Sequence, residues 1–318
     1  MNIADLIPKY RSEINNGLAD IYPRGPISLT KPVAYVLNGG GKRLRPLLTI
    51  FSAEACGGTK SSVFSAALAV EVLHNFTLVH DDIMDQDSIR HGQETVHNKW
   101  DDGVAILTGD AMLSLALRLL NETPVESHLQ MKIFIDGLLA VCEGQALDKE
   151  FENQSSVSLD DYIKMIDLKT GHLIGLAAEL GAVSTGMDSE ICEKVRDYGR
   201  LIGRAFQIQD DYLEIFSNSL NMGKSLESDI VLGKKTFLMI QALEKDTDII
   251  NSALELARNN FEKGIGNIRL YLENEGIKKR AQEEINNILK LADNKLNDLP
   301  IDKEKLLYFS KIIKKRGN

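Results

Sequence analysis

The stretch from His74 to His97 reads H-N-F-T-L-V-H-D-D-I-M-D-Q-D-S-I-R-H-G-Q-E-T-V-H and follows the apolar run A-A-L-A-V-E-V-L. The apolar run predicts a helix, which places Asp81 and Asp85 one turn apart on the same face, with Asp82 beside Asp81. Three carboxylates so close together raise one another's pKa unless water surrounds them or a multivalent cation neutralises them. Oxygen ligands favour a hard cation such as Mg²⁺, which usually also binds a substrate phosphate. The alternative is a solvated acidic helix end.

The fold class follows from how few helix breakers the chain has. Of the seven prolines, only Pro124 lies between Leu47 and Leu299. That span is rich in Ala, Leu, Ile, Glu and Lys, and no run alternates with the period of two that strands need. We therefore expect an all-α protein. No composition break or fixed repeat marks a boundary, so residues 1–318 are expected to form a single helical-bundle domain.

Prolines, glycines and apolar periodicity set the boundaries of the expected helices. An amphipathic helix over residues 1–22 precedes a proline-rich connector, and a helix starting near Ser61 is apolar on nearly all sides, so it should be buried. Further helices are expected at residues 100–120, 125–152, 159–168, 170–185 and 189–217, with shorter amphipathic helices from Phe237 after a polar connector over 218–235.

The composition excludes some functions. A formal net charge of −9 argues against a nucleic-acid binder held by bulk charge. Cys56, Cys142 and Cys192 have no metal-ligand spacing and are expected to be reduced and buried. The start of the chain does not resemble a secretion signal, and no uninterrupted run approaches about eighteen apolar residues. We therefore expect a soluble, cytoplasmic protein with no stable membrane insertion.

A second acidic group occurs in F-Q-I-Q-D-D-Y-L-E. Asp210 and Glu214 are again one helical turn apart, and Asp211 is adjacent to Asp210. This group lies about 130 residues after the first. On antiparallel neighbouring helices of a bundle, the two groups would face each other across a cavity. Together they could hold several divalent ions around one anionic group.

Basic residues occur where glycine frees the backbone and around the second acidic group. Lys42, Arg43 and Arg45 follow three glycines and lead into a helix N-terminus, which favours anions. The others are Arg90, Lys169, Lys224, Lys234 and Lys235. Any one of these lysines could be a solvated surface charge, but as a set they predict two anion sites. One is bridged to the carboxylates by metal, and the other is bound directly by Lys and Arg.

These motifs together resemble the trans-type isoprenyl diphosphate synthases, the polyprenyl synthetase family. The resemblance runs from about Pro32 to the C-terminus and is carried by G-G-K-R-L-R-P, H-D-D-I-M-D, R-H-G followed by T-V-H, G-D-A, E-G-Q-A-L-D, K-T-G, F-Q-I-Q-D-D and G-K-S-L-E-S-D-I-V-L-G-K-K-T. It implies a homodimeric, all-helical fold of the isoprenoid synthase type. Its central active-site cavity would hold an allylic diphosphate through several Mg²⁺ ions and isopentenyl diphosphate through basic residues.

The resemblance also implies a role for each matching residue. Metal ligands on the allylic diphosphate would be Asp81, Asp82, Asp85, Asp210, Asp211 and Glu214. Isopentenyl diphosphate would be bound by Lys42, Arg45 and His74, and the allylic diphosphate by Arg90, Lys169, Lys224 and Lys234. The reaction centre would be lined by Thr170 and Gln207. In the implied head-to-tail reaction, diphosphate departs, the isopentenyl double bond attacks the allylic cation, and a proton is lost.

Two positions depart from the family pattern. Glu214 stands where the family usually has Asp, and its longer arm can still reach a metal directly or through water, so function should survive. His91 stands where a second arginine usually helps to bind isopentenyl diphosphate. A permanent charge is thereby exchanged for one that titrates near pH 6.5. His74 could instead be a buried structural histidine, although its position before Asp81 favours a ligand role.

The product length is expected to be set on the helix that carries Asp81. Thr77 lies four residues earlier, about 6 Å along the helix axis, and Phe76 lies beside it. An aromatic residue here, with no insertion in D-D-I-M-D, is similar to archaeal-type geranylgeranyl diphosphate synthases. We therefore expect Phe76 and Thr77 to form the floor for geranylgeranyl diphosphate. Farnesyl diphosphate or a longer product is the alternative, and the floor could instead lie around Met112 and Leu113.

Other protein classes fit the sequence less well. A terpene cyclase or squalene-type synthase shares aspartate-rich helices, but a cyclase has no need of G-G-K-R-L-R-P to bind a second diphosphate. A carboxylate-bridged di-iron bundle needs Glu-x-x-His pairs, which neither acidic group contains. A non-catalytic partner subunit of a heteromeric synthase would be expected to have lost carboxylates, whereas all six acidic positions are filled. Chain elongation is therefore the expected activity.

Overall fold

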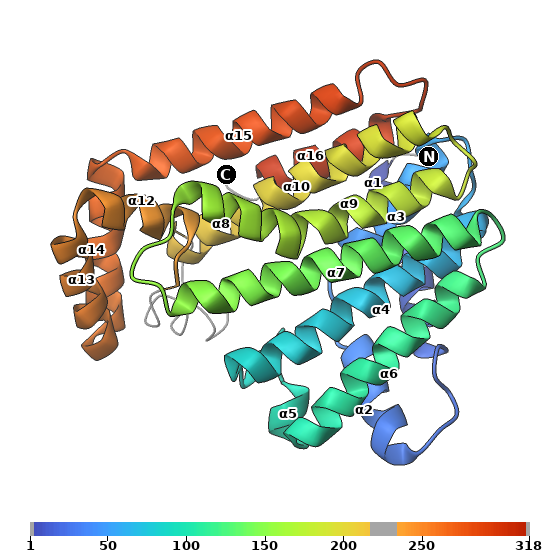
Figure 1. Cartoon of the computed structure of the whole chain (residues 1–318), viewed down its shortest axis with the longest axis horizontal. Helices are drawn as coiled ribbons and strands as arrows, with labels where there is room; N and C mark the ends of the chain where they lie inside the picture. Colours follow the sequence, from blue (N-terminus) through green and yellow to red (C-terminus); the bar gives the residue numbers. More distant parts are fainter. Residues whose placement is uncertain (1–2, 217–233, 316–318) are drawn as a thin grey trace. The chain divides into compact units, whose positions relative to one another are not determined.

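A computed structural model describes residues 3–216 and 234–315, and nearly all of its elements are helices (Figure 1). The helices are α1 (Ile3–Ala19), α2 (Ile27–Leu37), α3 (Leu44–Ala55), α4 (Lys60–Asp85), α5 (Val96–Lys99), α6 (Asp102–Asn121), α7 (Ser127–Glu152), α8 (Leu159–Ile166), η1 (Asp167–Gly171), α9 (His172–Val183), α10 (Ser189–Phe216), α12 (Phe237–Lys245), α13 (Thr247–Asn259), α14 (Phe261–Asn274), α15 (Ile277–Lys295) and α16 (Glu304–Lys315). Two short strands, β1 (Ile89–Arg90) and β2 (Gln93–Glu94), form a hairpin. The all-α prediction is confirmed.

The contacts within the chain divide it into two compact units. Unit 1 comprises residues 1–137, 173–199 and 295–309, and unit 2 comprises residues 138–172, 200–294 and 310–318. The helices α7, α9, α10, α15 and α16 contribute residues to both units. The first acidic group lies in unit 1 and the second in unit 2. The single domain expected over residues 1–318 stays a prediction.

Helix α4 is the core helix of unit 1. It packs against α3 and α6 and also contacts α1 and α2, and Figure 1 shows it beside α6. Thr59 precedes it in an extended conformation, and Gln86 ends it with a left-handed backbone at φ 56°. Its alanine, valine and leucine side chains are buried from Val63 to Leu73, and Val79 is buried as well. The prediction of a buried helix starting near Ser61 is confirmed.

Two helices of unit 1, α4 and α6, are long and apolar enough to cross a membrane by length and composition alone. Polar residues interrupt the apolar sequence of both helices, so neither contains an unbroken apolar run of that length. Of the most apolar window in each helix, 67% is buried in α4 but only 39% in α6. Helix α4 is therefore a core helix, whereas α6 leaves Ile106 and Leu107 exposed.

The three cysteines are free, as the sequence predicted, but they are not all buried. Cys56 and Cys192 are buried in unit 1. Cys142 is exposed, because its position on α7 turns its side chain to solvent. For Cys142 the sequence-based prediction of burial was wrong.

The backbone around Lys169 differs from the two separate helices expected at residues 159–168 and 170–185. Helices α8 and α9 follow one another without a gap, joined by η1. The backbone N–H of His172 donates to the carbonyl of Asp167, five residues earlier, which is the bond of a π-helix. Lys169 therefore lies inside a wide helical turn.

Side-chain caps start the shorter helices near the C-terminus of the chain. The side chains of Thr236, Asp246 and Asn260 accept backbone N–H groups three residues later, at the starts of α12, α13 and α14. Such caps satisfy donors that the first helical turn leaves without partners. The prediction of short amphipathic helices from Phe237 is confirmed, and the connector expected over 218–235 lies mostly outside the described residues.

Candidate active site

The acidic end of α4 does not present three equivalent carboxylates. Asp81 and Asp85 are half-buried, but Asp82 is only 4% exposed. Its carboxylate accepts a hydrogen bond from Nε of Arg90, whose Nη2 also donates to Asp87 at 3.1 Å. Burial raises the pKa of Asp82 to about 6, against the opposing charge of Arg90. Asp82 is therefore a buried partner of Arg90, and its expected role as a metal ligand stays a prediction.

The hairpin β1–β2 holds Arg90 in place, and sequence reasoning did not predict it. Ile89 pairs with Glu94, and Arg90 pairs with Gln93. The residues between the strands, His91 and Gly92, both have left-handed backbones, at φ 51° and 77°. Two such residues are typical of a tight hairpin turn, so the dipeptide His-Gly was the available signal.

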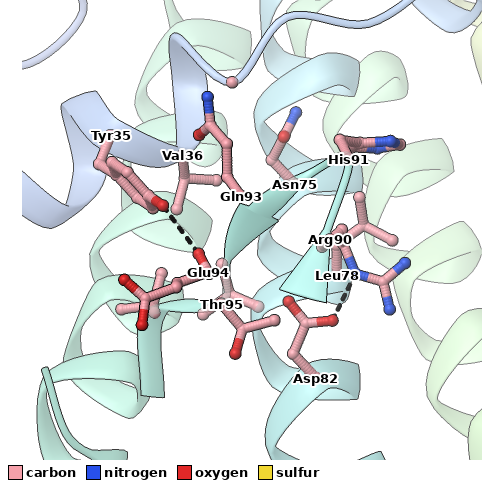
Figure 2. A pocket seen from close by; sticks show the side chains of 13 residues that line it. Tyr35, Val36, Asn75, Leu78, Asp82, Arg90, His91, Gln93, Glu94 and Thr95 are labelled. Atoms are coloured by element: carbon pink, nitrogen blue, oxygen red, sulfur yellow. Dashed lines mark hydrogen bonds and ion pairs between the residues drawn. The ribbon is translucent and has the colours of Figure 1, made fainter. Parts of the chain in front are cut away.

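A small pocket of about 50 Å³ lies where α2, α4 and this hairpin meet in unit 1. Figure 2 shows Asp82 and Arg90 on one side of it and Tyr35 on the other, with the Tyr35 hydroxyl donating to the carbonyl of Glu94 at 2.9 Å. Asn75 also lines the pocket, on the face of α4 that carries Asp82. The hairpin is thus tied to α4 by an ion pair and to α2 by a hydrogen bond.

The basic segment after the glycines contains one structural arginine. Arg43 is buried, and its guanidinium donates to Asn15 at 2.9 Å, to Glu71 at 2.7 Å and to the carbonyl of Leu37 at 2.7 Å. Its backbone is left-handed at φ 51°, directly before α3. Arg43 therefore anchors the segment, which leaves Lys42 and Arg45 as the anion-binding candidates.

Arg45 and His74 lie together, as the resemblance implied. Arg45 Nη1 is 3.0 Å from His74 Nε2. Burial, followed by the charge of Arg45, lowers the pKa of His74 well below its ordinary value, so its Nε2 is an acceptor for the arginine. Burial and the charges of Arg90 and Arg43 also lower the pKa of His91. His91 therefore becomes charged only at a pH lower than the sequence alone suggested.

In unit 2, the carboxylate of Asp211 is likewise buried and accepts hydrogen bonds from within the protein. Its Oδ2 accepts the Tyr162 hydroxyl at 2.5 Å and the backbone N–H of Phe237 at 3.0 Å, and its Oδ1 accepts Gln207 Nε2 at 3.2 Å. Burial raises the pKa of Asp211 to about 6. Asp210 and Glu214 are half-buried. Asp211 therefore joins α8, α10 and α12, and its expected role as a metal ligand also stays a prediction.

The turn η1 carries Lys169, which is expected to bind the allylic diphosphate, and Thr170, which is expected to line the reaction centre. Lys169 Nζ donates to Asp148 Oδ2 at 2.6 Å, and the Thr170 hydroxyl donates to Gln207 Oε1 at 3.0 Å. Thr170 and Gln207 are thus neighbours, as the resemblance implied. Asp148, the last residue of E-G-Q-A-L-D, was not singled out as a site residue.

The donor chemistry of Asp81, Asp85, Asp210 and Glu214 suits Mg²⁺, because all their ligand atoms are carboxylate oxygens. Within residues 3–216 and 234–315, no group of three or more His, Cys, Asp or Glu side chains is arranged as a complete metal site. Mg²⁺ usually keeps waters and shares a substrate phosphate, so a few carboxylates suffice for it. Lys234 is half-buried, and Lys224 lies outside the described residues.

The predicted product floor is well packed. Phe76 is 8% exposed, and its ring contacts the edge of the His80 ring at a centroid distance of 4.8 Å. The Thr77 hydroxyl donates to the carbonyl of His74 at 2.8 Å. The His80 ring in turn lies against Gly109 of α6, where a β-carbon would collide with it. Phe76 is therefore braced from α6 through His80.

Comparisons with known proteins agree with the resemblance. A family model described as polyprenyl synthetase matches residues 27–268. The geranylgeranyl diphosphate synthase of Methanosarcina mazei is 41% identical over 249 residues, which is 77% of this chain and 77% of that protein. The geranylfarnesyl diphosphate synthase of Natronomonas pharaonis is 36% identical over 269 residues, or 78% of this chain and 79% of that protein.

Solved structures share the fold along nearly the whole chain. A crystal structure of a geranylgeranyl pyrophosphate synthase has a TM-score of 0.91 and 37% identity, covering 99% of both chains. The polyprenyl synthase of Caulobacter crescentus, complexed with calcium and isoprenyl diphosphate, has a TM-score of 0.88 and 26% identity, covering 98% of this chain and 96% of that one. The range matched by the family model contains both acidic groups and the basic segment.

Proposed function

This chain belongs to the polyprenyl synthetase family, and we propose that it is a trans-prenyltransferase that condenses isopentenyl diphosphate with an allylic diphosphate to give geranylgeranyl diphosphate. The observation that carries the proposal is the arrangement on α4. His74, joined to Arg45, lies two helical turns before Asp81, roughly 10 Å along the axis. Helix α4 thus carries the metal-binding pair and also His74, which with Arg45 of α3 forms the anion-binding pair, at a separation that suits two diphosphate substrates.

The proposed metal ligands are the four half-buried carboxylates of the acidic motifs, whose oxygens suit Mg²⁺: Asp81 and Asp85 from α4, and Asp210 and Glu214 from α10. Bound Mg²⁺ supplies positive charge that stabilises a departing diphosphate. Several ions per active site are proposed, because a diphosphate offers many oxygens. In each acidic motif the middle carboxylate, Asp82 or Asp211, is proposed to hold neighbouring elements in position through its hydrogen bonds.

The remaining roles follow the charges and contacts of the described residues. Lys42, Arg45 and His74 bind isopentenyl diphosphate, with His91 beside them, and Arg90, Lys169 and Lys234 bind the allylic diphosphate. Lys224 is proposed for the same role from the sequence. Thr170 and Gln207 line the reaction centre, where fixed dipoles favour the developing allylic cation and bound reactants are held in contact.

The proposed product rests on Phe76. Incubating the protein with isopentenyl diphosphate, Mg²⁺ and each short allylic diphosphate, followed by chain-length analysis, should give mainly the twenty-carbon product. Phe76→Ser should lengthen the product, whereas Met84→Ser, on an exposed position of the same helix, should not. An unchanged length in Phe76→Ser would place the floor elsewhere, around Met112 and Leu113. Absence of condensation with every primer would favour a non-catalytic partner subunit.

We further propose that the protein is a soluble, cytoplasmic homodimer that folds as one domain over residues 1–318 and binds neither nucleic acid nor membrane stably. The exposed apolar residues Ile106 and Leu107 of α6, and Leu129 and Ile135 of α7, support a self-association surface in unit 1. An apolar surface of this kind is usually covered by a partner. Light scattering of the purified protein tests the dimer.

A further inference from the structure

Among the described residues of unit 2, the turn η1 is π-helical rather than α-helical. A π-helical turn carries one more residue than an α-helical turn, is rare, and occurs mostly at functional sites. Here it carries both Lys169 and Thr170, whose side chains reach Asp148 and Gln207. Something must keep this turn from relaxing to ordinary α-helix, because that change would rotate both side chains.

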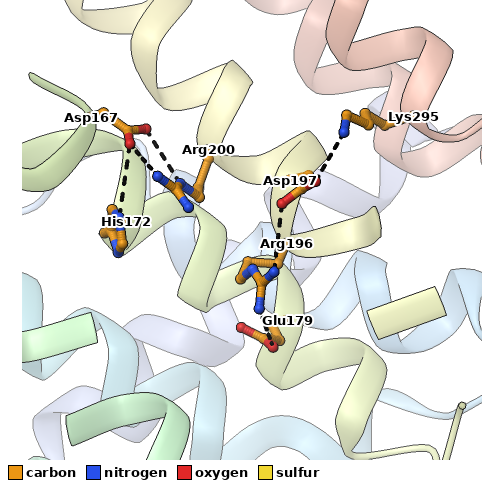
Figure 3. A network of polar contacts seen from close by, with 7 residues as sticks. All are labelled: Asp167, His172, Glu179, Arg196, Asp197, Arg200 and Lys295. Atoms are coloured by element: carbon orange, nitrogen blue, oxygen red, sulfur yellow. Dashed lines mark hydrogen bonds and ion pairs between the residues drawn. The ribbon is translucent and has the colours of Figure 1, made fainter. Parts of the chain in front are cut away.

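Asp167, the first residue of η1, is held by two arginines of α10. Arg200 donates to it through Nη2 and Nε, and Arg204 donates through Nε to Oδ1 at 2.8 Å. His172 Nε2 lies 3.8 Å from Oδ2. Figure 3 shows Arg200 and His172 directed at this carboxylate. The Asp167 side chain is 8% exposed, while those of Arg200 and Arg204 are 28% and 30% exposed.

The Asp167 carboxylate is ionised. Burial alone would raise its pKa, but hydrogen bonds and charge from Arg204 and Arg200 hold the pKa below its usual value. A buried ion pair adds little net stability compared with apolar residues of the same volume. Its two arginines are spaced i and i+4 on α10, so they fix both the position and the rotation of the turn.

Glycines press the same turn between two helices. A β-carbon at Gly144 of α7 would lie 2.7 Å from the Cα of Lys169, and one at Gly203 of α10 would lie 2.7 Å from the Cα of Gly171. These approaches are too close for any side chain. The backbone of η1 is therefore packed against α7 on one side and α10 on the other. The hydrogen bonds of Asp167 fix the orientation of the turn, which backbone packing alone does not.

The two arginines that hold Asp167 and the reaction-centre residue Gln207 lie on one face of α10. Gln207, which accepts the Thr170 hydroxyl, follows Arg204 by three residues, so both point to the same side of the helix. A shift of Asp167 relative to Arg204 would therefore also shift Thr170 relative to Gln207. Misplacement by about 1 Å can reduce a reaction rate on the order of a hundredfold.

We propose that Asp167, clamped by Arg200 and Arg204, is a positioning residue for the prenyl transfer reaction. It holds η1 in its π-helical form so that Lys169 and Thr170 keep their places in the reaction centre. The inference rests on the proposed function, because it assigns those two residues to catalysis.

The test separates positioning from mere stabilisation. Asp167→Ala should lower kcat by about ten- to a hundredfold while the KM for isopentenyl diphosphate changes less than about twofold. Glu190→Ala, which breaks an exposed ion pair with Lys194 on α10, is the matched control and should leave both constants unchanged. Asp167→Asn, which keeps the shape and one acceptor oxygen, should recover part of kcat and covers the case in which Asp167→Ala does not fold.

A double variant shows whether Asp167 acts through Lys169. In the Lys169→Ala background, Asp167→Ala should lower kcat by less than about twofold further, because residues that act as one unit are not additive. Full multiplication of the two losses, or a lower melting temperature with unchanged kcat, would overturn the proposal. A wild-type protein that makes no prenyl product would instead refute the proposed function itself.

Discussion

Removing the carboxylate of Glu71 should damage both the stability of unit 1 and the binding of isopentenyl diphosphate. The Arg43 and Glu71 side chains are 3% and 5% exposed, and their contact is 2.7 Å. In Glu71→Ala, the Arg43 guanidinium keeps its hydrogen bonds to Asn15 and the Leu37 carbonyl. Its buried positive charge is then no longer compensated by the Glu71 carboxylate. Breaking a buried pair in this way costs about 3–5 kcal/mol.

The expected melting shift follows from the chain length. A protein of 318 residues has an unfolding entropy of roughly 0.7 kcal/mol per degree, so the melting temperature should fall by about 4–8 °C in calorimetry. Glu13→Ala is the control, because its ion pair with Lys60 is much more exposed and should be worth less than about 1 kcal/mol.

The same variant should raise the KM for isopentenyl diphosphate, because Arg43 anchors the segment that carries Lys42 and Arg45. Replacing both partners with apolar residues, as Arg43→Met with Glu71→Leu, should restore most of the melting temperature but not the KM. A Glu71→Ala protein that melts within about 2 °C of wild type and binds isopentenyl diphosphate normally would refute the reasoning.

Changes at three other positions test further features of unit 1. Burial raises the pKa of Glu179 to about 7 despite Arg196 (Figure 3), so the folded state holds this proton more tightly than the unfolded chain. Stability should therefore fall by up to about 3 kcal/mol as the pH rises from about 4.5 to 7, and Glu179→Gln should flatten that dependence in urea titrations. His91→Arg should lower the KM for isopentenyl diphosphate about tenfold at pH 8, where His91 is neutral, and an unchanged constant would contradict its role. Leu107→Asp should turn a dimer into monomers in light scattering, while Ile249→Asp, also exposed, should not; a dimeric Leu107→Asp would place the interface elsewhere.

The sequence predicted the helices well, because helix formation depends on local periodicity and on breakers. Long apolar stretches without proline gave α4, α6 and α10 close to their observed bounds. The hairpin β1–β2 was missed, since strands of two residues show no alternation. The π-helical turn η1 was read as a gap, because its extra residue is accommodated by contacts with α7 and α10 rather than by its own composition.

The sequence predicted which residues belong to the candidate site, but not which side chains they contact. Spacing within one helix put Asp81 with Asp85 and Asp210 with Glu214, and the observed helices keep those pairs. Nothing local distinguishes Asp82 or Asp211 from its acidic neighbour. The difference comes from Arg90 on a hairpin and from Tyr162, which lies 49 residues away from Asp211 in the chain.

The sequence by itself determined the all-α class, the two acidic motifs and the basic segment, because these depend on residue type and on spacing along one helix. Only the tertiary structure decided which charges are structural. Arg43, Asp82, Asp167 and Asp211 are each buried against partners from other elements. A buried charge requires such a partner, and long-range packing alone selects it.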